Sequence, residues 1–299
     1  MILHPLTTFS QANRRQILLL IVGHLLWSAV IFLLSVSSQR LAVAGPGWSG
    51  IFIALQLYAA AQLLLPALLL HPESRRRSFY LFWGLSLALL IWLLNQLPAS
   101  GIGQELLTAL RSGALLLIAT VTAGALARYV HRLWEIIPVG IVMTLADFAS
   151  WRYGPTATFT EQIEHYRLSP EGAPPLVDMI LIKLAFPGSI GLAPLFGISD
   201  WIMVVFFAIV ADRFGVNDNL IGASGESLAR QGKIGRYLPI SVLALYIATL
   251  LAQLTGHFIP ALPLIALIML LWYTARFLLQ RQQGKKILPS SPDKDENRP

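Results

Sequence analysis

The chain has 299 residues, of which 56% are apolar and only 12% charged, and its formal net charge is +7. A soluble domain carries about 25% charged residues, so this composition predicts a polytopic membrane protein whose basic excess reflects topology rather than nucleic-acid binding. There is no cysteine, which excludes disulfides, thiolate catalysis and Cys-ligated metals. The six histidines are scattered without ligand spacing, so we expect neither a metal nor another cofactor.

A membrane-spanning helix needs about 20 mainly apolar residues. Eight stretches meet this requirement in chain order: 16–36, 50–70, 78–98, 107–130, 133–152, 194–214, 236–256 and 260–280. The sequence therefore predicts an all-α polytopic membrane protein with about eight transmembrane helices. Around them we expect a polar N-terminus over 1–15, without a cleavable signal, and a disordered polar tail over 282–299. Residues 16–130 would form a helical scaffold of four spans and residues 131–281 a second helical half.

The basic residues predict how the spans are oriented. They gather at the two termini and in alternate short connections: Arg14, Arg15, Arg75, Arg76, Arg77, Arg128, Arg132, Arg213, Arg230, Lys233, Arg236, Arg281, Lys285 and Lys286. Short cytoplasmic loops are enriched in Lys and Arg. Both termini are therefore predicted to be cytoplasmic in a plasma (inner) membrane, with the long connection 153–193 on the outer side.

Two carboxylates lie inside predicted spans, Asp147 in "VMTLADFASW" and Asp200 in "GISDWIMVV". An acid in a transmembrane segment is costly and is a candidate for function; the alternative is a structural hydrogen bond to a neighbouring helix. The first span runs outward and the second inward, and both acids fall roughly 8–9 Å below the outer surface at 1.5 Å per residue. They are therefore predicted to lie at the same level and to face each other.

Further local features fall at that level. Gly197 and Ser199 place small side chains beside Asp200, which allows close approach of another backbone, although plain helix packing would also use them. The last span begins with Pro260, Ala261, Leu262 and Pro263. Two prolines this close together leave backbone groups without intrahelical partners, which is tolerated only where protein or water covers them. The alternative is that a proline simply begins the helix.

An Asp in one span, a G-x-small-D sequence heading the next and a Pro-Ala-Leu one span from the end resemble the presenilin and signal peptide peptidase superfamily of intramembrane aspartyl proteases. The stretch "ILIKLAFPGSI" at 180–190 also resembles the "IKLxFP" sequence that signal peptide peptidases carry before their second catalytic Asp. The resemblance covers about 136–275. It implies a presenilin-like fold, with nine helices in the family where we count eight.

The resemblance implies that Asp147 and Asp200 are the catalytic pair and that Gly197, Ser199 and 260–263 line the active site. The predicted orientation is that of signal peptide peptidases, whose substrates are type II membrane segments and signal-peptide remnants. The expected partners are thus transmembrane peptides and the lipid bilayer. Two departures from the family are Ala146, where it has Tyr, and Ser199, where it has the second Gly of GxGD.

The expected chemistry is general acid–base hydrolysis of a peptide bond by water, with one proton shared by the two carboxyl groups. The β-branched stretch 176–187 reads as extended, and we expect strand addition of an unwound substrate there; the alternative is an interfacial helix. The residues concerned are Ile182, Lys183, Leu184, Phe186 and Pro187.

Other functions remain open. A catalytically inactive relative that binds membrane proteins would keep the fold, and a proton-coupled transporter would use the same Asp pair. A prepilin peptidase shares GxGD-type motifs but lacks the Pro-Ala-Leu-Pro. Among the remaining features, we expect His24, Gln56 and Gln62 to make interhelical hydrogen bonds, Trp201 to belong to an interfacial belt, and 222–233 to be a flexible loop.

Overall fold

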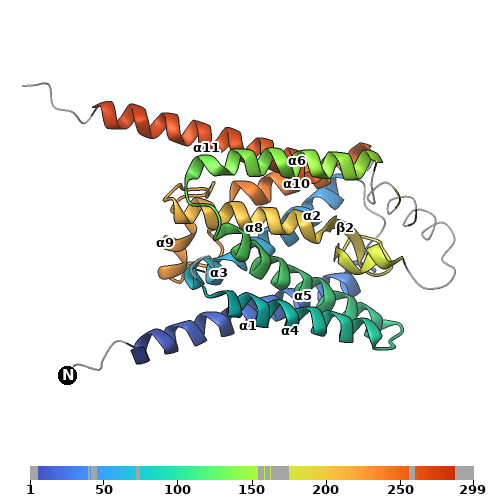
Figure 1. The fold of residues 1–299 in the computed structure, drawn as a ribbon. Coiled ribbons are helices and arrows are strands. Elements are labelled where there is room, and N and C mark those ends of the chain that lie inside the picture. Colours follow the sequence, from blue (N-terminus) through green and yellow to red (C-terminus); the bar gives the residue numbers. More distant parts are fainter. Residues whose placement is uncertain are drawn as a thin grey trace, which may run out of the picture.

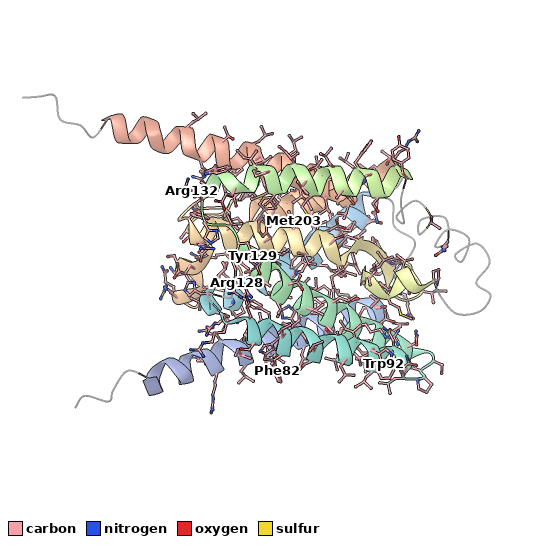
Figure 2. All side chains as sticks on the ribbon, viewed as in Figure 1. Phe82, Trp92, Arg128, Tyr129, Arg132 and Met203 are labelled. Carbon is pink, nitrogen blue, oxygen red and sulfur yellow. The ribbon has the colours of Figure 1, made fainter. Side chains whose placement is uncertain are left out.

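The protein is described by a computed structural model that covers residues 6–39, 41, 46–71, 75–153, 158, 162, 175–255 and 260–286. Over these residues the chain is mostly helical, and the long helices run roughly side by side as one bundle (Figure 1). Many apolar side chains stand outward on this bundle, including Phe82 and Trp92 (Figure 2). Outward apolar side chains over long helices are expected of a protein surrounded by lipid.

The first half of the chain forms five helices: α1 (Leu6–Ser38), α2 (Pro46–Gln62), α3 (Leu64–Leu70), α4 (Arg77–Gln96) and α5 (Ile102–Ala127). The predicted span 50–70 is therefore divided at Leu63 into two helices. Pro66 lies in the first turn of α3, where a missing N–H removes no intrahelical bond. α3 ends at His71, which has a left-handed backbone (φ 46°).

The second half begins with a 3-10 turn, η2 (Leu133–Glu135), and α6 (Ile136–Tyr153). After the connection come a second 3-10 turn, η3 (Leu176–Ile180), and the strands β1 (Leu181–Leu184) and β2 (Ala193–Gly197). The remaining elements are α8 (Ile198–Arg213), the short α9 (Gly225–Arg230), α10 (Ile240–Thr255) and α11 (Ala261–Lys286). The predicted tail begins inside α11, and residues 287–299 of it lie outside the described residues.

Each of the eight predicted spans coincides with helical structure. Five segments are long and apolar enough to cross a membrane: Arg14–Ser38, Gly47–Leu70, Arg77–Gln96, Ile102–Ala127 and Leu133–Ser150. α10 and the apolar part of α11 are shorter, and the predicted span 194–214 begins in β2 before it becomes α8. The structure thus supports a multi-pass helical membrane protein, to which a small antiparallel hairpin must be added.

The centre of the bundle is α8. Nearly all of its side chains from Trp201 to Ala211 are buried, because α5, α10, α11 and α3 surround it. A helix that is apolar on every side is stable only in such an enclosed position. The enclosure explains why a helix of 16 residues carries an almost unbroken apolar run.

α1 and α5 approach each other closely at Gly113. A Cβ atom at Gly113 would collide with Ser28 Oγ and lie 3.1 Å from the carbonyl oxygen of His24. Small residues permit this kind of backbone contact between membrane helices. The ring of His24 forms a hydrogen bond of 2.7 Å with the Leu20 carbonyl of its own helix, so this bond is local rather than the interhelical one we predicted.

The connection between α8 and α10 is held in place by buried polar groups, and the prediction of a flexible loop over 222–233 was wrong. Residues 225–230 form α9, which packs against α3. The side chain of Asn219 accepts from the amides of Ile221 and Leu238, at 3.1 and 2.9 Å, and donates to the carbonyls of Ala223 and Arg236, at 2.7 and 2.9 Å. Every hydrogen-bonding group of this amide is therefore used.

α1 begins and α11 ends at the same end of the bundle (Figure 1). Arg128 and Arg132 lie at that end as well (Figure 2), whereas the β1–β2 hairpin is at the opposite end. Two of the basic residues that predicted the topology, Arg128 and Arg132, thus lie at the end where α1 begins and α11 ends. That this end faces the cytoplasm stays a prediction.

Candidate active site

Asp200 lies in the first turn of α8. The chain leaves β2 in an extended conformation at Gly197 (φ −81°, ψ 161°), which is the N-cap of the helix, and Asp200 is the third helical residue. Its Oδ2 atom accepts a hydrogen bond of 2.9 Å from the Gly197 amide. This is the acidic half of a capping box, in which the side chain at the third helical position satisfies the free amide of the N-cap residue; Gly197 has no side chain to return a bond.

Asp147 projects from the middle of α6 toward the start of α11. Its carboxyl group accepts a hydrogen bond from the backbone amide of Leu262, in the first turn of α11, where amides lack intrahelical partners. The other oxygen, Oδ2, is buried and has no hydrogen-bond partner among the described residues. α6 packs on α11 near Gly140, where a Cβ atom would make ordinary van der Waals contacts of 3.7 Å with Ala266 and Leu270.

The two carboxyl groups are close enough to act on each other electrostatically. Each is bound to one backbone amide at the N-terminal end of a helix, Asp200 at α8 and Asp147 at α11. Helix N-termini favour negative charge, so this position partly compensates a charge in an apolar bundle. The structure therefore brings together Asp147, Asp200 and Leu262, three of the residues that the sequence singled out.

The residues around the pair are small or start helices. Pro260 directly precedes α11, and Ala261 and Pro263 lie in its first turn beside Leu262. A Cβ atom at Gly197 would lie 3.3 Å from Ser199 Oγ and 3.6 Å from Asp200 Oδ2. The absent side chain of Gly197 thus leaves a small volume bordered by a hydroxyl and a carboxylate oxygen.

The predicted extended stretch is partly a strand. Residues 176–180 form the turn η3, and β1 over 181–184 pairs antiparallel with β2, with Ile182 opposite Phe196 and Lys183 opposite Pro194. Leu195 has no partner residue on β1, because the register shifts there. Ile182 and Leu184 are buried, and Phe186 and Pro187 follow the strand. Lys183 forms an ion pair with Asp178 of η3.

The edge of β1 away from β2 is occupied by side chains of the helices. The amide of Lys183 donates to Ser112 Oγ at 3.1 Å. Gln56 of α2 donates to the carbonyl of Ala185 and accepts from its amide, both at 2.9 Å. A glutamine side chain thus takes the place of a neighbouring strand. Among the described residues no strand pairs with the other edge of the hairpin, that of β2, which leads directly to Asp200.

Two predictions about neighbouring residues need correction. Trp201 is fully buried and its ring packs against Phe196, with 6.3 Å between the ring centres, so it does not belong to an interfacial belt. Gln56 and Gln62 bind loop or strand backbone rather than other helices. Gln62 donates to the Tyr237 carbonyl at 2.8 Å and accepts from the Gly235 amide at 2.9 Å.

The contact between Gln56 and the Ala185 backbone was not predicted. The only signal in the sequence was a carboxamide inside an apolar span, and its partner lies 129 residues further along the chain. Within the described residues, no group of three or more His, Cys, Asp or Glu side chains is placed to hold a metal ion. The arrangement that the structure offers is a pair of carboxyl groups beside an unpaired strand edge.

Comparison of the chain with models of protein families, with curated proteins and with solved structures gives no match.

Proposed function

We propose that the protein is an intramembrane aspartyl protease that hydrolyses peptide bonds within transmembrane segments. The observation that supports this most directly is that Asp147 and Asp200, on different helices, lie close enough for an electrostatic interaction between their carboxyl groups, with one Asp147 oxygen left without a partner among the described residues. Two adjacent carboxyl groups share a proton, because both cannot ionise cheaply. The shared proton is therefore assigned to the pair and not to Asp147 or Asp200 individually.

The reaction follows from this sharing. The ionised carboxylate takes a proton from a water molecule as its oxygen attacks the scissile carbonyl carbon, and the protonated carboxyl group donates its proton to the carbonyl oxygen. The resulting tetrahedral intermediate collapses when its C–N bond breaks and the leaving nitrogen receives a proton. The amides of Gly197 and Leu262 keep the two carboxyl groups in place throughout.

A substrate helix must unwind before its carbonyl is accessible, and an unwound peptide needs partners for its backbone groups inside the membrane. The unpaired edge of β2 offers strand addition directly before Asp200. The sequence had placed this pairing on 182–187. Because Gln56 and Ser112 occupy the outer edge of β1, we assign the pairing to β2 and give β1 the role of supporting it.

The order of the motifs along the chain supports a relationship to the presenilin and signal peptide peptidase superfamily, and we propose that the bundle is of that type. With both termini cytoplasmic, the carboxyl pair lies toward the outer face. The substrates we propose are type II membrane segments and signal-peptide remnants.

The test is cleavage of a type II reporter segment by the full-length protein in lipid vesicles. Asp147→Asn and Asp200→Asn keep the size of each side chain but remove its titration, and each is expected to lower the cleavage rate by about 100-fold or more. The matched control is Asp218→Asn, which alters a buried carboxyl group in the connection between α8 and α10 and should leave cleavage unchanged.

Undiminished cleavage in either site variant would rule out the carboxyl pair as the catalytic group. Two other results would favour the competing functions. Reporter binding without cleavage by the wild-type protein would indicate an inactive relative. Proton-driven solute uptake that Asp147→Asn abolishes would indicate a transporter.

A further inference from the structure

Ser199 differs from its neighbours in that its side chain is exposed, whereas Ile198 and Asp200 are partly buried and Trp201 is fully buried. Among the described residues its hydroxyl has no hydrogen-bond partner. The hydroxyl nevertheless borders the volume left open at Gly197, which it shares with Asp200 Oδ2. The Ser199 hydroxyl, in the first turn of α8 and next to Asp200, can therefore donate a hydrogen bond to a bound molecule or accept one from it.

The edge of β2 that leads to this volume is poor in hydrogen-bond donors. The amide of Gly197 is bonded to Asp200, and Pro194 has no N–H. Lys183, which lies opposite Pro194, directs its amide to Ser112 and away from β2, so this pair does not bond across the hairpin and the Pro194 carbonyl faces the free edge. A peptide added there finds acceptors for its amides but lacks donors for its carbonyls.

A strand advances about 3.3 Å per residue, so a peptide aligned with Pro194 passes Gly197 within a few residues and reaches the volume beside Ser199. A hydroxyl donates one hydrogen bond and rotates to suit its acceptor. The position of Ser199 thus supplies a donor where the strand edge has none, and the missing side chain of Gly197 lets a peptide backbone come close.

Resting on the proposed function, we propose that Ser199 contacts the substrate and donates a hydrogen bond to a backbone carbonyl of the unwound segment beside the scissile bond. The ligand class is an extended peptide backbone, recognised without regard to its side chains. Ser199 acts on the substrate and leaves the carboxyl pair unchanged.

The test compares three variants of the full-length protein in lipid vesicles. Ser199→Ala and Ser199→Gly remove the hydroxyl, and Ser199→Thr keeps it. Loss of one hydrogen bond to substrate is expected to raise KM about tenfold in the first two variants, while Ser199→Thr stays near the wild type. The pH profile of kcat should not change, because the carboxyl pair is untouched.

A second measurement separates binding from catalysis. In the Asp200→Asn background, a fluorescent peptide with the sequence of the reporter segment should bind about tenfold more weakly when Ser199→Ala is added. Since Ser199 is exposed, the unfolding midpoints of all variants should agree with that of the parent protein, which excludes a folding defect.

Several results would overturn the assignment. KM and peptide binding unaffected by Ser199→Ala would remove the contact, and equal losses in Ser199→Ala and Ser199→Thr would show that shape rather than the hydroxyl matters. A displaced pH profile would show that the hydroxyl acts through Asp200. If the wild type cleaves the reporter and Ser199→Ala has the same KM, only the role of Ser199 is disproved. If Asp200→Asn still cleaves the reporter, the proposed function itself is disproved.

Discussion

At the scale of single residues, backbone amides decide how the buried acids are accommodated. Asp200 is bonded to the Gly197 amide and Asp147 to the Leu262 amide, and both amides belong to the start of a helix. A buried polar group without a partner costs about 1–3 kcal/mol, so these contacts are needed for the acids to stay in the bundle. Such contacts satisfy the two carboxyl groups without a basic partner, and no ion pair of Asp147 or Asp200 is found among the described residues.

Asp218 offers a pH-dependent test at the same scale. It is buried in the connection between α8 and α10 and accepts a hydrogen bond of 2.9 Å from the Tyr237 hydroxyl. Burial raises the pKa of Asp218 from 3.8 to about 7; the Tyr237 bond opposes this increase in pKa, and the nearby Asp212 adds to it. Because the folded state holds this proton more tightly, the free energy of unfolding falls as pH rises from about 4 to 7, by on the order of 4 kcal/mol.

Urea unfolding in detergent at pH 5 and pH 8 would measure this fall. Asp218→Asn can still accept from Tyr237 but does not titrate, so its unfolding midpoint should depend less on pH. Equal pH dependence in the variant and the wild type would contradict the assignment of this effect to Asp218.

At the scale of elements, α2 holds two separate non-helical segments through one glutamine each. Gln56 binds the backbone next to β1, and Gln62 binds the connection that precedes α10. Each side chain satisfies one amide and one carbonyl that would otherwise lack partners in an apolar environment. α2 thereby fixes the hairpin relative to the bundle and, through the hairpin, the start of α8.

Replacing the glutamines one at a time gives a matched pair. Gln56→Leu leaves the amide and carbonyl of the buried Ala185 unsatisfied, which costs about 1–3 kcal/mol for each group, and should displace the hairpin and abolish cleavage. Gln62→Leu should lower stability by a smaller amount, since the Gly235 side of its contact is exposed, and should leave cleavage largely intact. Unfolding midpoints and reporter cleavage measure both effects. Equal cleavage rates in the two variants would show that the position of the hairpin does not matter for cleavage.

At the scale of the whole molecule, the bundle has a basic end and a hairpin end. Its peripheral helices α4 and α6 present most of their surface outward, as expected of helices that face lipid. α6 packs mainly on α11, so Asp147 is carried by a helix with few other neighbours. The carboxyl pair therefore lies at the junction of an enclosed helix and a peripheral one.

The absence of cysteine allows the orientation to be tested with single substitutions. Ile190 in the hairpin turn is 97% exposed and Ile234 in the connection after α9 is 78% exposed. In intact cells, a membrane-impermeant maleimide should label Ile190→Cys from outside and should label Ile234→Cys only after permeabilisation. The reverse pattern would invert the proposed topology and with it the substrate orientation.

The spans could be predicted from the sequence because hydropathy is a local property that needs no knowledge of neighbours. That Asp147 and Asp200 lie near each other could be predicted from their shared depth on neighbouring spans, whereas the backbone amides that bind them could not be predicted, because helix starts at Gly197 and Ala261 are not marked by hydropathy. The burial of Trp201 was missed, since it depends on four helices surrounding α8. The bond between Gln56 and Ala185 joins distant parts of the chain and leaves no periodic signal.

The hairpin also bears on self-association. An exposed strand edge in a membrane invites pairing with a second copy of the same hairpin. Here Gln56 closes one edge, while the other carries Pro194 and the register shift at Leu195, two features that discourage strand pairing between copies. Two copies that met along the free edge of β2 would each bring a proline and a register shift to the contact, which disfavours dimerisation through the hairpin more than pairing with a single peptide that has neither feature.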